Sequence, residues 1–184
     1  MIVTSAQFQS FLSVEGSTMS LLDIDVVIQV AEDILNAHCG RNFTLHTENE
    51  VFEIPDSFMY QLHTRNYPIV TGSVLLSNNT TPYTDDDLNI DYSAGIIKLP
   101  SDDYFVQGRD LVQISYQCGW GVGGAPKDFQ YLVYKTGIVC KDSSTTGFQS
   151  LRVDDFQVTL SKDMIEYGLD GLARGILRRY ERVI

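Results

Sequence analysis

The sequence predicts an α+β fold: a small antiparallel helical bundle, with a long central helix plus three others, an antiparallel β insertion and a short β-hairpin. Three observations lead to this prediction. Residues 20–41 are mostly apolar and have the length of a long helix. Short alternating runs between turn residues fill about residues 44–118, and helical patterns return after Pro126. We therefore expect one domain over residues 1–184, with a β-rich insertion at about 44–118.

The central helix is expected to run from Ser20 to Arg41, after a short helix over Thr4 to Val14 that Thr4 or Ser5 caps. Ser20 is a good capping residue, and Gly40 suits the residue that ends a helix. The polar residues of the central helix fall on one narrow stripe, namely Asp25, Gln29, Glu32 and Asn36.

A helix with a single polar stripe should be packed on most of its sides. One interpretation is an ordinary core helix. The other is that surplus apolar surface also meets a neighbouring subunit. The candidate subunit-interface residues are Ile24, Val27, Ile28 and Arg41.

The β insertion is predicted from short runs that are alternating, β-branched or aromatic and that are separated by Gly, Pro, Asn and Asp. Short strands with short connections pair antiparallel, so five or six such strands are expected. The runs are Glu50–Ile54, Met59–His63, Ser73–Ser77, Leu88–Asp91, Gly95–Leu99 and Leu111–Tyr116.

After the insertion, Pro126 suits the first turn of a helix that is expected to reach about Lys141. Ser143 to Gly147 is a predicted polar loop, and a tight hairpin is predicted from Gln149–Val153 and Phe156–Leu160. The last helix should span about Lys162 to Glu181. Three glycines, each costing about 1 kcal/mol against Ala, make that helix weak unless it packs on a partner. They are Gly168, Gly171 and Gly175.

Charge is distributed unevenly along the chain. The formal net charge is −11, yet the segment from Arg174 to the end has four arginines and one glutamate, a net of +3, which leaves −14 for the rest. So acidic a body disfavours tight DNA binding. The basic end either complements the dipole of its helix or docks onto an acidic partner. The candidate docking residues are Arg174, Ile176, Leu177, Arg178, Arg179, Tyr180 and Arg182.

No motif supports catalysis, so we expect no catalytic, cofactor or metal site and no enzyme. The run Gly119–Gly124 fits G-x-G-x-x-G, but no parallel βαβ unit is predicted around it, which favours a flexible loop. Three cysteines without a C-x-x-C pair indicate buried thiols. The sequence also lacks an apolar run long enough to span a membrane and a signal peptide, so the chain is expected to stay where it is made.

The order of elements resembles the head-completion, or head–tail connector adaptor, proteins of tailed bacteriophages. Two departures are Asp154, where the family has Gly in its hairpin, and Glu181, where a basic residue is usual. The segments that carry the resemblance are Ala37 to Phe43 (similar to T-G-R-x-F), Arg65 to Val70 (R-x-Y-P-V), Asp91 to Ile97 (Y-x-x-G-x-I), Ile114 to Trp120 with Pro126 to Phe129 (V-x-Y-x-A-G-Y … P-x-D-L), Leu151 to Val158 (S-x-x-x-G-D-x-S-V) and Ile176 to Tyr180 (L-x-x-Y-R-R).

The resemblance implies a structural protein of the virion, at the head–tail interface, made in the host bacterial cytoplasm. Such adaptors form a ring, usually of twelve copies, under the portal, extend the DNA channel and present a docking surface to stopper or tail-completion proteins. DNA is then expected to pass through the lumen without specific binding, and the basic C-terminal end to contact the portal protein. We expect removal of residues 174–184 to abolish docking and to leave the fold intact.

Two alternatives come from the residues. One is a β-rich tail or baseplate module that binds a sugar or another protein. The other is a nucleotide-binding enzyme that uses the Gly119–Gly124 loop.

Overall fold

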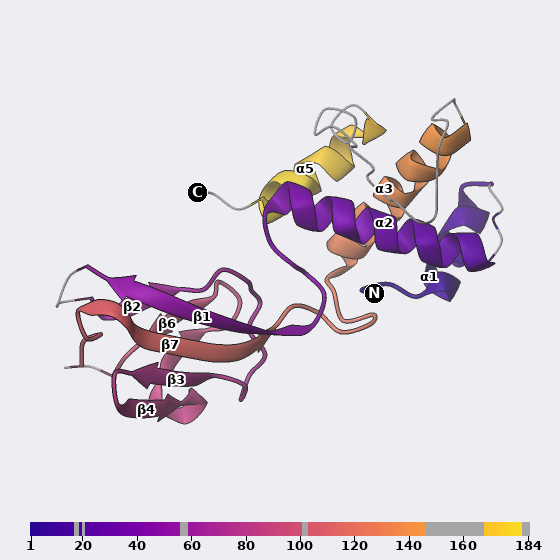
Figure 1. Cartoon of the computed structure of the whole chain (residues 1–184). Helices are drawn as coiled ribbons and strands as arrows, with labels where there is room; N and C mark the ends of the chain where they lie inside the picture. Colours follow the sequence, from indigo (N-terminus) through magenta and orange to yellow (C-terminus); the bar gives the residue numbers. More distant parts are fainter. Residues whose placement is uncertain (17–18, 20, 56–58, 101–102, 146–167, 182–184) are drawn as a thin grey trace. The chain divides into compact units, whose positions relative to one another are not determined.

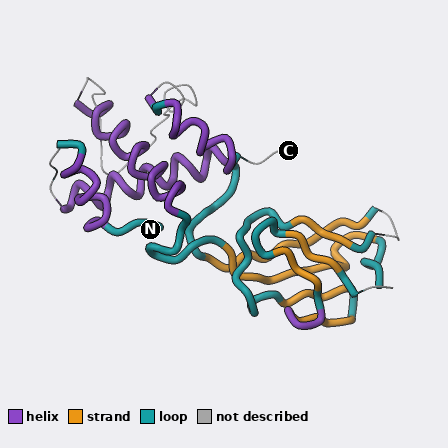
Figure 2. Tube along the Cα trace, turned by 180° about the vertical axis from the view of Figure 1, so that it is seen from behind, coloured by secondary structure: helices purple, strands orange, loops and turns teal. Residues whose placement is uncertain are grey.

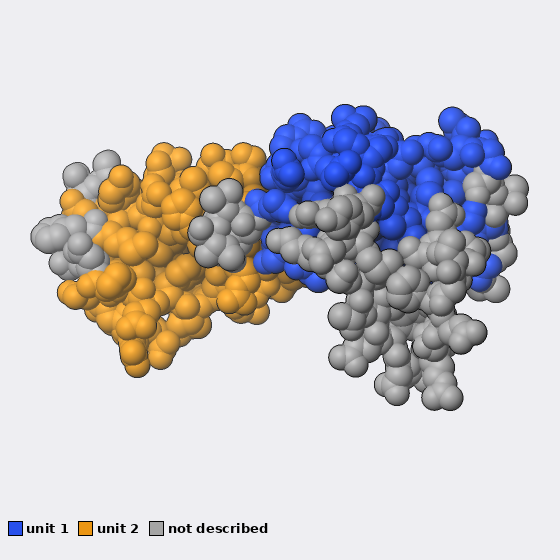
Figure 3. Space-filling view, turned by 90° about the horizontal axis from the view of Figure 1, so that it is seen from above, with its two compact units in different colours: residues 1–41, 121–184 blue, residues 42–120 orange. Residues whose placement is uncertain are grey.

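The chain divides into two compact units in a computed structural model that describes residues 1–16, 19, 21–55, 59–100, 103–145 and 168–181. One unit comprises Met1–Arg41 and Gly121–Ile184, and the other comprises Asn42–Trp120 (Figure 3). We call them the helical unit and the sheet unit, because helices form the first and strands the second (Figure 2). The α+β class predicted from the sequence is confirmed.

The helical unit contains α1 (Ser5–Val14), α2 (Leu21–Cys39), α3 (Lys127–Thr145) and α5 (Gly171–Tyr180) (Figure 1). Thr4 caps α1 as predicted: its hydroxyl accepts the Gln7 amide N–H at 3.2 Å, and the Gln7 side chain accepts the Thr4 N–H at 2.9 Å. Gly40 follows α2 with φ +66°, the left-handed conformation that ends helices.

Two predicted boundaries in this unit are wrong. The helix that begins after Pro126 continues to Thr145, beyond the predicted start of a loop at Ser143, because the sequence has no Gly or Pro before Gly147 to stop it. The last helix does not run unbroken from Lys162, because Asp170 is extended (φ −68°, ψ 169°) and caps α5 by accepting the Ala173 N–H at 2.8 Å. The predicted hairpin, 149–160, lies outside the described residues.

The core of the helical unit forms where α2 packs on α1 and α3, and α3 packs on α5. From α2 it takes a single buried face, at the spacing of one helical stripe: Ile24, Ile28, Ala31, Leu35 and Cys39. Within a single chain, α2 is not packed on most of its sides as the sequence predicts, since Val26 is 51% exposed. Glu32, predicted on the polar stripe, is 5% exposed because its carboxylate accepts the backbone N–H of Ile2.

The sheet unit contains seven described strands in two antiparallel sheets. The larger sheet has the order β1-β7-β3-β4 and the smaller one β2-β6-β5. A strand at residues 81–84 was missed, because Pro82 argues against a strand and is tolerated here only at the sheet edge. The strands are β1 (His46–Ile54), β2 (Gln61–His63), β3 (Leu75–Asn78), β4 (Thr81–Thr84), β5 (Asn89–Asp91), β6 (Ile96–Lys98) and β7 (Gly108–Cys118).

Both sheets contribute side chains to one buried cluster in the sheet unit, among them Leu62 and Ile97 from the small sheet and Leu76, Ile114 and Tyr116 from the large one. Alternation explains this, because every second residue of β7 points to the same side of the sheet. The sheet unit therefore has its own hydrophobic core.

The two backbone segments that begin and end the sheet unit lie side by side. The Phe43 and Trp120 rings stack with centroids 5.5 Å apart and planes 3° from parallel. The Trp120 N–H donates to the Phe43 carbonyl at 2.8 Å, and the Leu45 N–H to the Trp120 carbonyl at 3.0 Å. Gly119, with φ +90°, makes this close approach of the two backbone segments possible, because a Cβ there would lie 2.6 Å from the Thr44 carbonyl oxygen.

Candidate assembly surfaces

The predicted docking segment divides into a buried and an exposed half on α5. Ala173, Ile176 and Leu177 are buried in the helical core. Arg174 and Arg178, one turn apart, are exposed on the opposite side, and Leu172, on another side of the helix, is 65% exposed. Of the predicted docking residues, Arg174 and Arg178 are exposed and form no ion pair with another residue in the described part of the chain.

The C-terminal turn of α5 is held against the start of α3. The Tyr180 ring meets Phe129 edge-on at 4.9 Å, and its hydroxyl donates to Asp128 Oδ1 at 2.9 Å. Burial, with the Asp128 contact, raises the pKa of Tyr180 to about 12. Arg179 Nη2 lies 3.0 Å from the other oxygen of Asp128. Through these contacts Tyr180 and Arg179 hold the end of α5 against the start of α3.

The same end of α5 is also tied to the end of α2. The His38 ring nitrogen lies 2.6 Å from a Glu181 carboxylate oxygen, and the His38 side chain is buried. The Arg41 guanidinium lies over the Tyr180 ring, 6.0 Å from its centroid. Glu181, where the resembled family has a basic residue, therefore serves an internal contact. Arg182 lies outside the described residues.

The candidate subunit-interface residues on α2 are mostly used inside the chain. Ile24 and Ile28 are fully buried in the helical core, and Arg41 is 7% exposed. Val27 is half-buried, next to Gly137 of α3. Of the four candidates only Val27 keeps part of its surface, and Val26 beside it in sequence is exposed.

The glycine-rich stretch Gly119–Gly124, for which the sequence favours a flexible loop, forms a turn that is held by hydrogen bonds within the chain. The Gly123 N–H donates to the Ile2 carbonyl at 2.7 Å, and the Gly124 N–H to the Gly121 carbonyl at 2.9 Å. The side chain of Gln130 donates to the Ala125 carbonyl at 2.8 Å. Phosphate binding by such a stretch needs amide groups that point outward, and these two amides are occupied within the chain.

A cysteine and a histidine that the sequence does not link come together at the start of β1. Cys118 Sγ lies 3.5 Å from His46 Nε2, which lies 3.2 Å from a Glu48 oxygen. A nucleophilic cysteine needs a lowered pKa. Burial and the Glu48 and Glu50 charges instead raise the pKa of Cys118 to about 12. The thiol is therefore protonated at neutral pH and acts as a core side chain.

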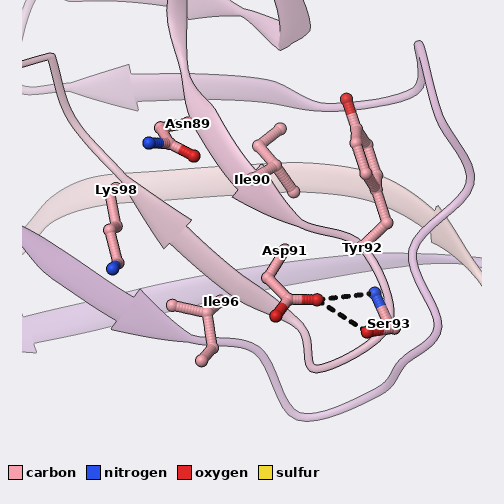
Figure 4. Close-up of a pocket in the computed structure, with 7 residues that line it drawn as sticks. All are labelled: Asn89, Ile90, Asp91, Tyr92, Ser93, Ile96 and Lys98. Carbon is pink, nitrogen blue, oxygen red and sulfur yellow. Dashed lines mark hydrogen bonds between the residues drawn. The ribbon is translucent and has the colours of Figure 1, made fainter.

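A shallow hollow of about 580 Å³ lies at the β5–β6 hairpin, lined by Asn89, Ile90, Tyr92 and Lys98 among others (Figure 4). Its carboxylate, Asp91, accepts hydrogen bonds from the Ser93 hydroxyl at 2.7 Å, the Ser93 N–H at 3.1 Å and the Ala94 N–H at 3.0 Å. These bonds, led by the Ser93 hydroxyl, lower the pKa of Asp91. The carboxylate thus serves to shape the hairpin turn.

In the described part of the chain, no three His, Cys, Asp or Glu side chains are grouped so that they could hold a metal ion. None of the helices in that part combines the length and apolar character that crossing a bilayer requires.

No family model and no curated protein sequence matches the chain. Solved structures do match it over nearly its whole length. A chain in the neck of an empty gene transfer agent particle, computed with C6 symmetry, gives a TM-score of 0.62 at 12% identity, with 98% of this chain and 89% of the other covered. A chain in the native gene transfer agent virion gives 0.59 at 11%, with the same coverage.

A chain in the neck of the native particle, computed with C12 symmetry, gives a TM-score of 0.58 at 12% identity, covering 97% of this chain and 88% of the other. At such low identity these likenesses establish a shared fold.

Proposed function

We propose that this protein is a structural component of the neck of a tailed phage or phage-like particle. In this proposal, copies assemble into a ring under the portal, twelve in number as in the adaptors that the sequence resembles. The ring extends the DNA channel and offers a docking surface to stopper or tail-completion proteins. The observation that carries the proposal is the fold itself, which matches chains of gene transfer agent necks over 97–98% of this chain.

The charge of the protein supports a role in which DNA passes without being held. Proteins that grip DNA neutralise phosphates with Lys and Arg, and each such contact makes binding tighter and more salt-dependent. This chain has 13 basic and 24 acidic residues. A channel wall of that character would repel the phosphate backbone and let DNA move.

The portal contact in this proposal is the exposed side of α5 that carries Arg174 and Arg178. Two exposed cations one helical turn apart suit an acidic partner surface. The buried Ile176 and Leu177 support the contact from inside. Because removal of residues 174–184 would also take Ile176 and Leu177 out of the helical core, the deletion tests folding and docking together.

Charge reversal tests the portal contact without opening the core. We expect Arg174→Glu with Arg178→Glu to prevent the protein from joining portal-containing, DNA-filled heads, as scored by electron microscopy of reconstituted particles. The reason is that two attractive contacts with an acidic surface become repulsive. Thermal unfolding should be nearly unchanged, since exposed substitutions alter stability by about 0.5 kcal/mol or less.

The matched control is Arg65→Glu with Lys127→Glu, which makes the same change in net charge at two exposed positions outside α5. This control should still join heads. Normal head joining by the α5 variant would remove α5 as the portal contact. Failure of the unmodified protein to join any head would count against the neck role itself.

A further inference from the structure

The outer face of the larger sheet is uncharged, although the unit that carries it is acidic. The sheet unit has 11 acidic and 3 basic residues, a net of −8. The register pairs Thr47 with Gln117, Asn49 with Ser115 and Val51 with Gln113 on the side of β1 and β7 away from the core. These six residues define what we call the neutral sheet face.

The neutral sheet face continues across the neighbouring strands. Leu75 of β3 lies opposite Ser115, and the alternate residues of β3 and β4 that share this side are also uncharged. Charge returns at the end of the face, where Glu53 and Arg109 pair at 3.1 Å and Asp110 of β7 is exposed. Two aliphatic side chains stand out from it, Val51 at 55% and Leu75 at 61% exposure. The four strands lie side by side in Figure 1.

The charge pattern indicates which partner fits such a face. A nucleic acid would require cations, and a basic protein would favour the acidic surfaces that the sheet unit offers elsewhere. A second copy of this chain carries the same net charge of −11, so like charges oppose contact between copies wherever acidic residues face each other. Copies can approach with least repulsion where a surface has no charge and some exposed apolar area.

We propose that the neutral sheet face is a contact surface for a neighbouring copy of this chain. The inference rests on the proposed neck role, from which it takes the expectation that copies meet in a ring. With strand spacings of about 4.8 Å and residue steps of about 3.4 Å, the face covers on the order of 300 Å². That is less than a stable pair requires, so free copies associate weakly and a ring gains strength from repeated contacts.

Two isosteric substitutions test the assignment. Gln113→Glu with Gln117→Glu puts two negative charges on the face without changing side-chain shape. Sedimentation velocity from about 10 µM to about 1 mM should show weak self-association of the unmodified protein. The variant should associate at least tenfold more weakly, because new charges face an acidic neighbour. Raising the salt concentration should narrow this difference, since salt screens exposed charges.

The control is Gln9→Glu with Gln29→Glu, which adds the same two charges at exposed positions of α1 and α2. The control should associate like the unmodified protein. Equal association of the face variant and the unmodified protein would overturn the proposal, as would an unmodified protein that stays monomeric throughout. Loss of association in the control would move the contact to the helices. Binding of duplex DNA that the face variant loses would assign the face to DNA instead.

The head-joining assay separates this inference from the neck role. An unmodified protein that joins heads but shows no association dependent on the face would refute only the sheet contact. Association through the face without head joining would refute only the neck role.

Discussion

At the scale of single residues, polar groups in this protein mostly hold the fold together. The Tyr116 hydroxyl is buried, donates to Glu50 and accepts the Asn66 N–H at 3.3 Å. Glu32 accepts the Ile2 N–H inside the helical core. Such groups carry weight because a buried polar atom without a partner costs about 1–3 kcal/mol. Thr136 shows the other case, since its buried Oγ1 has no hydrogen-bond partner among the described residues.

Replacing Thr136 should therefore reveal that cost. Thr136→Val keeps the shape and removes the hydroxyl, so we expect the free energy of unfolding to stay unchanged or to rise by about 1 kcal/mol. Thr136→Ala, which removes the methyl group as well, should lower it by about 1 kcal/mol through the cavity that it leaves. Urea unfolding of both variants measures this. A Val variant destabilised by as much as the Ala variant would mean that the hydroxyl is hydrogen-bonded in solution.

At the scale of elements, glycines have opposite consequences on two helices. Gly137 of α3 lets α1 approach closely, because a Cβ at this position would lie 2.8 Å from Phe8 Cζ and 3.2 Å from Val27 Cγ1. Gly175 of α5 faces open space, with nothing within 4 Å of a Cβ. The helix α5 packs on α3 of its own chain, and that its glycines weaken it stays a prediction.

The same substitution at the two glycines should change stability in opposite directions. We expect Gly137→Ala to lower the free energy of unfolding by about 1–3 kcal/mol, because the added methyl group overpacks the contact with Phe8. Gly175→Ala should raise it by about 1 kcal/mol through helix propensity. Thermal and urea unfolding provide the comparison. Stabilisation by both would show that α1 and α3 do not approach as closely as described.

At the scale of the whole molecule, the chain builds two cores from three sequence segments. Residues 1–41 and 121–184 make one unit, and residues 42–120 make the other. The sheet unit has its own buried cluster, and its two ends are joined by the Phe43–Trp120 stack and the hydrogen bonds around it. Such an insertion closes on itself before the chain returns to the helices.

The sheet unit should therefore fold when produced alone. A fragment of residues 42–120 is expected to give a dispersed NMR spectrum and a cooperative thermal transition, since its core and end contacts are all internal. Trp120→Ala in the fragment should lower the transition by removing the stack, by less than the roughly 3–5 kcal/mol of a core aromatic, because Trp120 is only partly buried. An unfolded fragment would show that the sheet unit depends on the helical unit.

The parts of the fold that could be predicted were those that depend on residues close together along the chain. Hydrophobic periodicity and capping residues located α1 and α2, because both depend on neighbours within one or two turns. Strand β4 was missed, since the decisive fact was that Pro82 lies at a sheet edge, and edges are set by pairing. The break before α5 was missed as well, because Asp170 is recognised as a cap only when the chain around it is known to be extended.

The candidate surfaces were harder to predict. The sequence identified the basic segment at the C-terminal end, but it could not say that Ile176 and Leu177 point inward while Leu172 points outward. It also could not say that Ile24 and Ile28, proposed for contacts between copies, are already buried in their own chain. The neutral sheet face has no sequence signature, because its residues come from strands separated by long stretches and meet only through register.

By itself the sequence determined the α+β class, the Thr4 cap of α1, the end of α2 at Gly40, the acidic body and the basic C-terminal end. These follow from composition and from interactions between residues close along the chain. Only the tertiary structure decided which apolar residues the core consumes, which arginines remain exposed and which strands form an uncharged face. Those properties depend on distant segments packing together, and burial and strand register are settled only when the chain has folded.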